Sequence, residues 1–257
     1  MIRECSILIS NWRGKEAVAL TIESILKRTD YPAFKIIVYD SSGKGSQDRQ
    51  YLRIQEELGN IILLTHETHT LHDNAIPILL EHCDTELAVI MDSDVTINKN
   101  GRDWLRFMSN IINGPKMLGV ARHKDKGIMR DRKTYIAPAF QPFCMMLNMP
   151  VFRKIEKDIH WEHQVVKIKD YKGSHVFREF RENFNYVFGD VGFSLAEKIL
   201  FDNKEGLVMY PLPILIYPVR ITHWGGISSL ANHPEHPRVK TKWMFIKEEL
   251  KNIRNES

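Results

Sequence analysis

The sequence has few cysteines. Its 257 residues include three, Cys5, Cys83 and Cys144, which are widely separated and odd in number. A disulfide framework uses an even number of cysteines and a zinc site uses closely spaced pairs, so this pattern predicts neither. We therefore expect the protein to work in the reducing cytoplasm.

Long apolar runs and a targeting segment are also missing. The longest apolar stretches, such as residues 87–91 and 213–219, are far shorter than the ~20 residues that cross a bilayer. At the start of the chain, Arg3 and Glu4 interrupt an apolar stretch that is too short for a signal sequence. The sequence thus predicts no transmembrane segment.

The chain shows no strong charge bias, internal repeat or low-complexity segment. Its formal net charge is +4, from 36 basic and 32 acidic residues. This excess is too small for a nucleic-acid-binding surface but suits a small anionic ligand, so we expect no nucleic-acid partner. The composition, 43% hydrophobic and 26% charged, is that of an ordinary soluble globular protein, and one large core is the simpler interpretation of its length.

The first half contains a regular alternation of apolar runs and helical patterns. Strands are predicted at residues 5–9, 35–39, 61–64 and 87–91, and helices at residues 18–26, 47–58, 74–82 and 103–112. Four strand–helix units in succession predict an α/β fold with a mostly parallel central sheet and helices on both faces. Ligands bind such sheets at the carboxyl ends of the strands, where Asp40, Asp92 and Asp94 are expected to lie.

The second half is less regular. Its predicted parts are a charged stretch at 122–133, a strand at 143–147, a helix after Asp190, a strand at 214–219 and a helix at 239–253. The charged stretch is interpreted as a solvated loop or as a mobile lid over phosphates. The last helix combines an apolar stripe with several lysines, so it either packs on the domain or rests on an anionic membrane surface.

Asp92 and Asp94 stand one residue apart just beyond the predicted strand 87–91, in AVIMDSDVT. Two carboxylates in this position can hold Mg²⁺ or Mn²⁺, because hard cations prefer oxygen ligands. They could also be turn and cap residues that open the next helix. A third interpretation makes Asp92 the nucleophile of a haloacid-dehalogenase-type phosphatase.

The phosphatase interpretation has partial support further along the chain. Residues 188–190, FGD, resemble the later Gly-Asp motif of those phosphatases, but Gly192, Phe193 and Ser194 occupy the place of its companion acid. About ninety residues of strand–helix pattern also precede Asp92, whereas the first motif of those phosphatases usually lies near the N-terminus.

Three segments of the first half resemble family 2 glycosyltransferases of the GT-A fold. They are CSILISNWR, ALTIESILKRTDYPAFKIIVYDSSGKGSQD and LHDNAIPILLEHCDTELAVIMDSD, and a later segment, FGDVGFSLAEKILFDNKEGLVMYPLPILIYPVRITHWGG, continues the likeness. The resemblance covers about residues 3–230. It implies one catalytic domain at 1–232, with a nucleotide-sugar-binding half at 1–115 and an acceptor-binding half at 116–232, followed by an amphipathic helical tail at 233–257.

The resemblance also implies roles for residues of the donor site. Asp40 would hydrogen-bond the nucleotide base, although it could be an Asx-turn residue instead. Asp92 would lie near the ribose and a metal-bound water, and Asp94 would ligate the metal. The other residues expected to contact the donor are Ser10, Asn11, His72, Asn74 and Ser93; of these, His72 departs from the family's usual Arg-Asn pair and Asn74 could simply cap its helix.

The later segment implies roles for four more residues. Asp190 would be the general base that takes a proton from the acceptor hydroxyl, with a helix N-cap as the alternative. His223 would be a third ligand of the metal or diphosphate, or else a structural histidine. Gly225 and Gly226 would let backbone N–H groups approach the diphosphate, or form only a turn.

One further pattern is excluded. THETH at residues 65–69 resembles a zinc-protease motif, but only one residue separates Glu67 from His69, whereas the zinc motif needs two so that both histidines share a helix face. We predict a polar loop after a strand.

Taken with the resemblance, these features predict an inverting, metal-dependent glycosyltransferase. It would use Mn²⁺ or Mg²⁺ to move a hexosyl unit from a nucleoside diphosphate sugar to a hydroxyl of a saccharide or other acceptor, in glycan or polysaccharide biosynthesis. A UDP-sugar is the default donor, with dTDP- and GDP-sugars open. The alternatives are a phosphohydrolase that uses Asp92 and a non-catalytic sugar-nucleotide-binding protein.

Overall fold

The structure is a computed structural model. It describes residues 2–124, 129–131, 134–136, 139–161, 164–167, 186–189, 193–200, 203–212, 220–224 and 237–256.

The predicted strands and helices of the first half are all present. In chain order they are β1 (Cys5–Asn11), α1 (Lys15–Arg28), β2 (Phe34–Asp40), α2 (Gln47–Glu57), β3 (Ile62–Thr65), α3 (His72–Glu81), β4 (Leu87–Asp92), β5 (Val95–Ile97), η1 (Lys99–Gly101) and α4 (Trp104–Ile111). Helix α3 begins two residues earlier than predicted. Asp94 leads directly into β5, so the interpretation of Asp92 and Asp94 as caps of a following helix is wrong.

The second half adds more strands than the sequence predicted. Its elements are β6 (Met117–Lys124), β7 (Met129–Asp131), β8 (Thr134–Ile136), β9 (Ala139–Asn148), α5 (Met149–Phe152), η2 (Glu156–Asp158), β10 (Gln164–Lys167), β11 (Tyr186–Gly189), α6 (Phe193–Leu200), β12 (Val208–Pro211), β13 (Ile221–His223) and α8 (Pro237–Arg254). The strand at 143–147 and the helices after Asp190 and at 239–253 are confirmed. The interpretation of 122–133 as a loop is wrong for residues 122–124, which end β6, and for β7. Backbone pairing there outweighs the charged composition. The strand predicted at 214–219 lies outside the described residues.

A seven-stranded sheet forms the centre of the molecule, in the order β12-β6-β9-β4-β1-β2-β3. All its neighbouring pairs are parallel except those of β9, which runs antiparallel to both β4 and β6. The predicted α/β fold with a mostly parallel sheet is therefore confirmed. Strands β7, β8, β10 and β11 form a separate four-stranded sheet.

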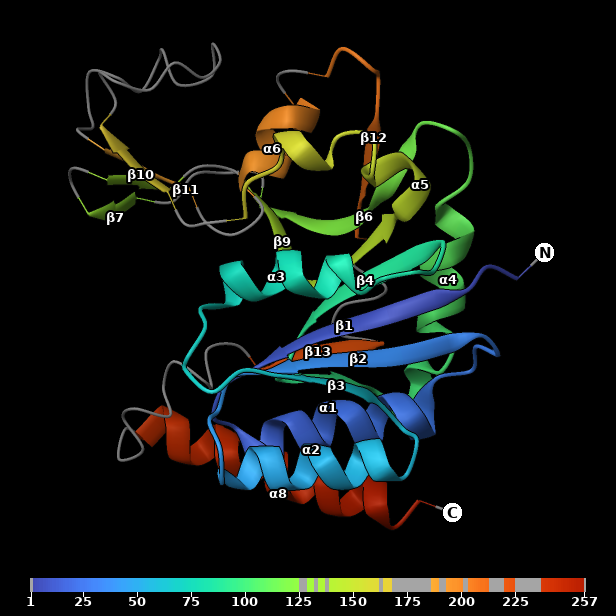
Figure 1. Cartoon of the computed structure of the whole chain (residues 1–257), viewed down its shortest axis with the longest axis vertical. Helices are drawn as coiled ribbons and strands as arrows, with labels where there is room; N and C mark the ends of the chain where they lie inside the picture. The colour runs from blue at the N-terminus through green and yellow to red at the C-terminus, as the bar shows by residue number, and fades with distance from the viewer. Residues whose placement is uncertain are drawn as a thin grey trace.

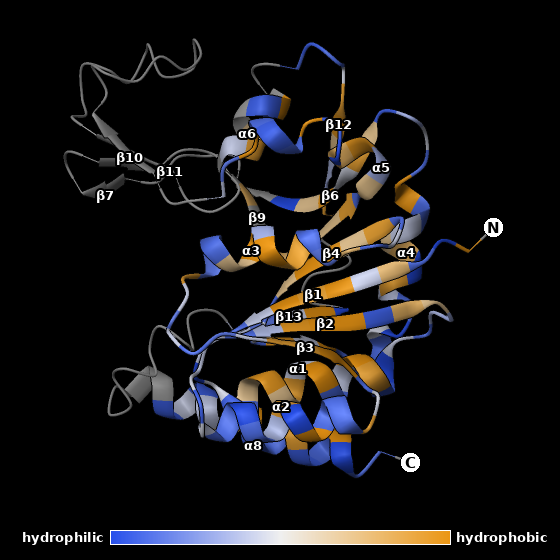
Figure 2. Ribbon diagram, in the orientation of Figure 1, coloured by the Kyte–Doolittle hydropathy of each residue, from blue (hydrophilic) through white to orange (hydrophobic). Residues whose placement is uncertain are grey.

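Helices cover both faces of the central sheet (Figure 1). Because successive side chains of a strand point to opposite faces, Ile7 and Ile9 of β1 join the core cluster that includes α1, α4 and α8, whereas Leu8 joins the cluster that includes α3 and α5. Figure 2 shows the apolar residues concentrated on the central strands and the hydrophilic residues on the outer sides of α2 and α8. Each face of the sheet therefore has its own apolar core.

Helix α8 packs against α1, at the bottom of the view in Figure 1. Ile246, Leu250 and Ile253 are buried in the cluster beneath α1, and Trp243 packs against it. The interpretation in which this stripe packs on the domain is thus confirmed. The division at residue 232 between domain and tail stays a prediction.

The described residues include no helix that is long and apolar enough to cross a membrane. The three cysteines are free and buried, in agreement with the prediction that they form no disulfide. The cytoplasmic location stays a prediction.

Candidate active site

A cavity of about 250 Å³ lies at the carboxyl edge of the parallel strands. Strand register brings its residues together: Ser10 of β1 stands beside Asp92 of β4, and Asn11 stands beside Asp40 of β2. The lining residues are Ser10, Asn11, Trp12, Tyr39, Ser41, His69, Thr70, His72, Ala75, Asp92, Ser93 and Asp94. Six of the residues predicted to contact the donor or metal, far apart in the sequence, therefore share one cavity.

Asp92, Asp94 and His223 form a compact cluster beside this cavity. His223 Nε2 lies 3.1 Å from Asp92 Oδ2 and 3.2 Å from Asp94 Oδ1. One potential ligand atom from each of the three side chains lies within 4.8 Å of the other two. The structure thus brings together the three residues that the sequence predicted as metal ligands.

Two short strands and one hydroxyl group position this cluster. His223 ends β13, which pairs with β5 so that His223 stands opposite Val95, and Trp224 N donates to Asp94 O at 3.0 Å. Thr21 Oγ1 of α1 donates to Ser93 O and accepts from Val95 N. The turn that carries both carboxylates is therefore held by hydrogen bonds from one side and by β13 from the other.

The cluster shifts the pKa of its members. Burial acts to lower the pKa of His223, but its hydrogen bonds to Asp92 and Asp94 outweigh burial and raise that pKa to about 9. Burial likewise acts to raise the pKa of Asp92, and the hydrogen bond from His223 together with the charges of His72 and His223 lowers it. The imidazolium of His223 therefore compensates the charge of the two carboxylates in this structure.

Phe143 of β9 holds the plane of the His223 ring. The two ring centroids are 4.7 Å apart and the rings are within 3° of parallel. Phe143 is buried, and it stands on β9 next to Cys144, which pairs with Met91 at the end of β4. The guanidinium of Arg122 lies 5.9 Å from the centroid of the Phe143 ring. Phe143 was not predicted, because only the pairing of β9 with β4 brings it to the site.

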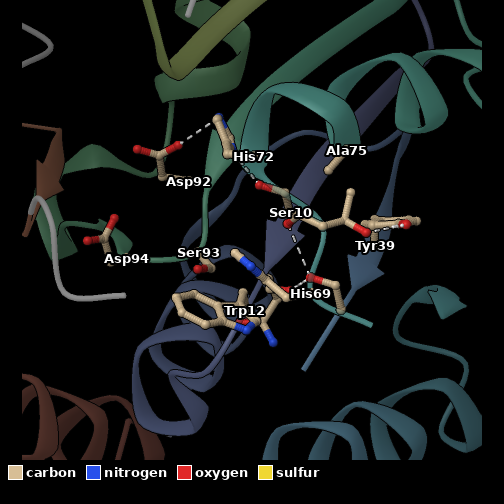
Figure 3. Close-up of a pocket in the computed structure, with 12 residues that line it drawn as sticks. Ser10, Trp12, Tyr39, His69, His72, Ala75, Asp92, Ser93 and Asp94 are labelled. Carbon is tan, nitrogen blue, oxygen red and sulfur yellow. Dashed lines mark hydrogen bonds and ion pairs between the residues drawn. The ribbon is translucent and has the colours of Figure 1, made fainter. Parts of the chain in front are cut away.

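His72 approaches Asp92 from the opposite side to His223. Its Nε2 lies 3.4 Å from Asp92 Oδ1, and its Nδ1 is hydrogen-bonded to Ser10 Oγ. Figure 3 shows His72 pointing toward Asp92, with Ser10 at its other nitrogen. Asp92 thus has an imidazole facing each of its oxygens.

Asp40 occupies a different environment from the one predicted. It is completely buried and does not line the cavity. Its Oδ2 pairs with Arg49 Nε, and its Oδ1 accepts hydrogen bonds from Asn11 Nδ2 at 2.9 Å and from Ser42 Oγ at 2.7 Å. Asp40 therefore orients Asn11, which does line the cavity, and its direct contact with a base stays a prediction.

Asn11 presents to the cavity an acceptor that no donor among the described residues meets. Its Nδ2 is held by Asp40 and by Ser42 Oγ, while its buried Oδ1 receives no hydrogen bond from the residues that the structure describes. Buried polar atoms rarely remain without a partner. Asn11 Oδ1 is therefore suited to accept an N–H from a bound molecule.

Aromatic side chains that the sequence did not single out complete the cavity. The rings of Trp12 and His69 lie 3.9 Å apart between centroids, and Tyr39 OH is hydrogen-bonded to Thr70 Oγ1. In Figure 3, Tyr39 lies across the cavity from Asp92 and Asp94. Trp12 directly follows β1 and His69 lies in the loop after β3, so their places at strand ends were a signal that could have found them.

The absence of a helix at residues 65–69 confirms that THETH is not a zinc-protease motif.

The remaining predicted residues are Asn74, Asp190, Gly225 and Gly226. Asn74 is exposed in the first turn of α3, and Leu71 holds the N-cap position without a side-chain cap. The cap interpretation of Asn74 is therefore wrong, and its contact with a donor stays a prediction. Asp190 lies outside the described residues, as do Gly225 and Gly226.

Comparison with known families decides which class of protein uses this site. The model of the family described as glycosyl transferase family 2 matches residues 6–163, more than half of the chain. The chain belongs to glycosyl transferase family 2. A search among curated proteins found no significant match.

Solved structures similar to this family 2 chain include two proteins in complex with a nucleotide or nucleotide sugar. The mannosyltransferase PcManGT from Pyrobaculum calidifontis, in complex with GDP-Man and Mn²⁺, is 17% identical with a TM-score of 0.47, over 60% of this chain and 47% of its own. TarS 1–349 from S. aureus, in complex with UDP, is 16% identical with a TM-score of 0.45, over 62% of this chain and 50% of its own. This chain spans about half the length of these proteins.

Family membership bears on the choice between the two chemistries proposed for Asp92. Family 2 proteins are nucleotide-sugar glycosyltransferases of the GT-A fold, and the sheet described above is the mixed α/β sheet of that fold. The cavity lies at the carboxyl edge of the strands, where α/β sheets bind their ligands. The match therefore favours a transferase over a phosphatase in which Asp92 is the nucleophile.

Proposed function

We propose that the protein transfers a hexosyl unit from a nucleoside diphosphate sugar to an acceptor hydroxyl, with inversion and with the help of a divalent cation. The observation that carries this proposal is the convergence of Asp92, Asp94 and His223 within 4.8 Å at the carboxyl edge of the sheet. A cation held by this cluster would bind the diphosphate of a donor whose nucleoside fills the cavity.

The three side chains fit a divalent cation by their chemistry. Two carboxylates supply hard oxygen atoms, and the imidazole of His223 supplies a nitrogen that suits Mn²⁺ better than Mg²⁺. When bound there, the cation would neutralise negative charge on the departing diphosphate. Asp94 and His223 would hold it, and Asp92, already flanked by His72, would complete the set.

The cavity end at Asn11 would receive the nucleoside. Asn11 Oδ1 would accept a base N–H, and its orientation would depend on Asp40 and Arg49 behind it. Asp40, which was predicted to hydrogen-bond the base, would then act on the base by orienting Asn11. Trp12, beside His69, offers an aromatic surface for a base or ribose. A uracil base, whose ring carries one imide N–H, is the default donor base.

The acceptor hydroxyl would attack the anomeric carbon as the bond to the diphosphate breaks. Asp190, which lies between β11 and α6 in the chain, is our proposed base for the hydroxyl proton. Its role rests on the sequence resemblance alone. Replacement of Asp190 by asparagine should abolish transfer while leaving donor binding intact.

The first experiment is a thermal-shift screen of nucleoside diphosphate sugars, with and without Mn²⁺. A specific ligand raises the melting temperature by mass action, so we expect a shift that needs both a nucleotide and Mn²⁺. Asp94→Asn should remove the metal-dependent part, whereas Asp84→Asn, a change at an exposed carboxylate far from the site, should not. If Asp94→Asn and Asp190→Asn both retained full turnover of the donor, the proposal would fail.

The same material tests the two alternatives. Release of phosphate from simple phosphomonoesters, with an adduct trapped on Asp92, would establish the phosphohydrolase. Nucleotide binding without hydrolysis or transfer across a panel of acceptors would establish a non-catalytic sugar-nucleotide-binding protein.

A further inference from the structure

The cavity contains two buried polar atoms that have no hydrogen-bond partner in the protein. Among the residues that the structure describes, Asn11 Oδ1 and His72 Nε2 are the only buried side-chain nitrogen or oxygen atoms in this condition. Both residues line the cavity. Buried polar atoms of folded proteins almost always have a partner, so two such atoms in one cavity point to a bound molecule. The proposed function gives Asn11 a base N–H but gives His72 Nε2 no partner.

Ser10 and Asp92 determine what kind of group His72 presents. The Nδ1 atom of His72 is hydrogen-bonded to Ser10 Oγ, and the hydrogen bond at one imidazole nitrogen sets the protonation of the other. When the Ser10 hydroxyl donates to Nδ1, the proton lies on Nε2. Asp92 favours this form, because its Oδ1 lies 3.4 Å from Nε2 and a lone pair on Nε2 would face a negative oxygen. His72 therefore presents an N–H donor.

His72 and Asp92 together select the chemistry of the missing partner. Although Nε2 lies near Asp92 Oδ1, it makes no hydrogen bond to it, so the N–H is not directed at the carboxylate. A group that binds to both must accept from Nε2 and donate to Oδ1. A hydroxyl does both, whereas a phosphate oxygen only accepts and would be repelled by the carboxylate. The missing partner is therefore a hydroxyl.

The place of this pair along the sheet edge indicates which hydroxyl it is. Asn11 stands beside the end of β2, whereas Ser10, its neighbour in β1, stands beside Asp92 of β4. In Figure 3, dashed lines join His72 to Ser10 and to Asp92. His72 thus lies between the end of the cavity proposed for the base and the cluster proposed for the diphosphate. In a nucleoside diphosphate sugar, the ribose connects these two parts.

We propose that His72 Nε2 and Asp92 Oδ1 together bind one hydroxyl of the donor's ribose, and that Ser10 positions His72 for this contact. The hydroxyl accepts from Nε2 and donates to Oδ1. A nucleotide that lacks this hydroxyl leaves both groups unpaired, so it binds more weakly. The inference rests on the proposed function and adds to it a residue that determines specificity for the sugar of the nucleoside.

Calorimetric titration with UDP, 2′-deoxy-UDP and 3′-deoxy-UDP in the presence of Mn²⁺ tests the proposal. Removal of one of the two hydroxyls should raise the dissociation constant of the wild type about tenfold, and removal of the other should have a smaller effect. The sensitive position identifies the bound hydroxyl. The same series with GDP and its two deoxy forms makes the result independent of the base.

Variants of His72 and Ser10 connect this preference to the proposed contact. The readout is the ratio of the dissociation constants of the sensitive deoxy form and the parent nucleotide, because a general loss of nucleotide or metal affinity cancels in it. His72→Phe keeps a ring but has no N–H, so it should lower the ratio several-fold. His72→Gln, whose amide N–H can take the place of Nε2, should retain most of the ratio. Ser10→Ala should lower it, since the imidazole is no longer held.

His69→Phe is the matched control. His69 also lines the cavity, but its ring contacts Trp12 and no ion pair joins it to Asp92 among the described residues. Its replacement should change the affinity for parent and deoxy nucleotides alike and so leave the ratio unchanged. Circular dichroism should show that all variants remain folded.

Equal binding of the parent nucleotide and both deoxy forms by the wild type would overturn the proposal and would assign the place between His72 and Asp92 to a water molecule. An unchanged ratio in His72→Phe or Ser10→Ala would overturn it too, as would an equal change of the ratio in His69→Phe. In these cases the nucleotide still binds, and the proposed function stands. If neither UDP nor GDP bound at all, the proposed function itself would fail, and the inference with it.

Discussion

At the scale of single residues, the site depends on side chains that orient other side chains. Asp40 holds Asn11, and Arg49 in turn holds Asp40. A carboxylate buried with a guanidinium is restricted in orientation because both groups would lose hydrogen bonds by moving. The acceptor that Asn11 offers to the cavity is therefore fixed before any ligand binds.

Phe143 acts in the same way on His223. We expect Phe143→Leu to weaken Mn²⁺ binding by about tenfold, a typical effect for a residue that orients a metal ligand. Without the parallel aromatic ring, the imidazole can rotate away from the two carboxylates. Electron paramagnetic resonance of free Mn²⁺ measures the dissociation constant without any need for turnover.

A nearby phenylalanine of β9 provides the control. Phe140 is as buried as Phe143, so Phe140→Leu should lower stability similarly and leave the Mn²⁺ dissociation constant unchanged, while Phe143→Tyr should retain binding. Mn²⁺ affinity in Phe143→Leu equal to that of the wild type would contradict the prediction. If His223→Ala also bound Mn²⁺ normally, the proposed metal site itself would be wrong.

At the scale of elements, α8 is joined to the domain by ion pairs as well as by its apolar stripe. Arg28 of α1 is almost fully buried, and it pairs with Glu249 and with Glu256. Arg28 Nη1 also donates to Ile97 O at the end of β5. One guanidinium thus connects α1, the β5–β13 pair and the end of α8.

This pairing predicts a dependence of stability on pH. The hydrogen bond from Arg28 lowers the pKa of Glu256 below its ordinary value of 4.5. A carboxyl group with a lowered folded pKa stabilises the folded state above its unfolded pKa, and that stabilisation is lost as pH falls through the folded pKa. Glu256→Gln should therefore cost about 1 kcal/mol at pH 7 and progressively less as the pH falls below 4.5.

Urea unfolding of the wild type and Glu256→Gln at a series of pH values measures this difference. Glu248→Gln, at an exposed position of the same helix, is the control and should show a smaller effect at every pH. A cost of Glu256→Gln that stays constant through the acid range would show that the ion pair is not its cause.

At the scale of the whole molecule, two apolar clusters on the two faces of one sheet determine how the chain unfolds. The cluster on the α1 face includes residues from β1, α4 and α8. Segments that share a cluster lose their contacts together, so we expect α8 to unfold with the sheet in one transition.

Ile246→Ala tests this coupling. Ile246 is fully buried on α8, and its truncation should lower the free energy of unfolding by about 2 to 4 kcal/mol. Met244→Ala, two residues earlier but 72% exposed, should change it by less than about 0.5 kcal/mol. Far-ultraviolet circular dichroism and tryptophan fluorescence should report the same midpoint in both variants; two separate transitions would show that α8 forms an independent unit.

The sequence predicted the first half of the fold well because its strands and helices are local patterns. The strands before Asp40 and Asp92 are continuous apolar runs, and each ends in a polar turn. The second half was harder to predict. Part of β9 was found as an apolar run, but β6 and β12 were not predicted, and they pair with each other although they lie far apart in the sequence. The interpretation of Asn74 as a helix cap was wrong for a local reason, because α3 begins two residues before the position that its pattern suggested.

The sequence by itself determined the family, the alternation of strands and helices, and the placement of Ser10, Asn11, Asp92 and Asp94 at strand ends. Parallel strands aligned in register necessarily bring such ends to one edge. Only the tertiary structure decided that His223 faces both carboxylates, that Phe143 stacks on it, and that Asp40 acts behind Asn11. These relations depend on strand pairings between segments that are far apart in the sequence. A local sequence pattern does not predict which distant segments pair.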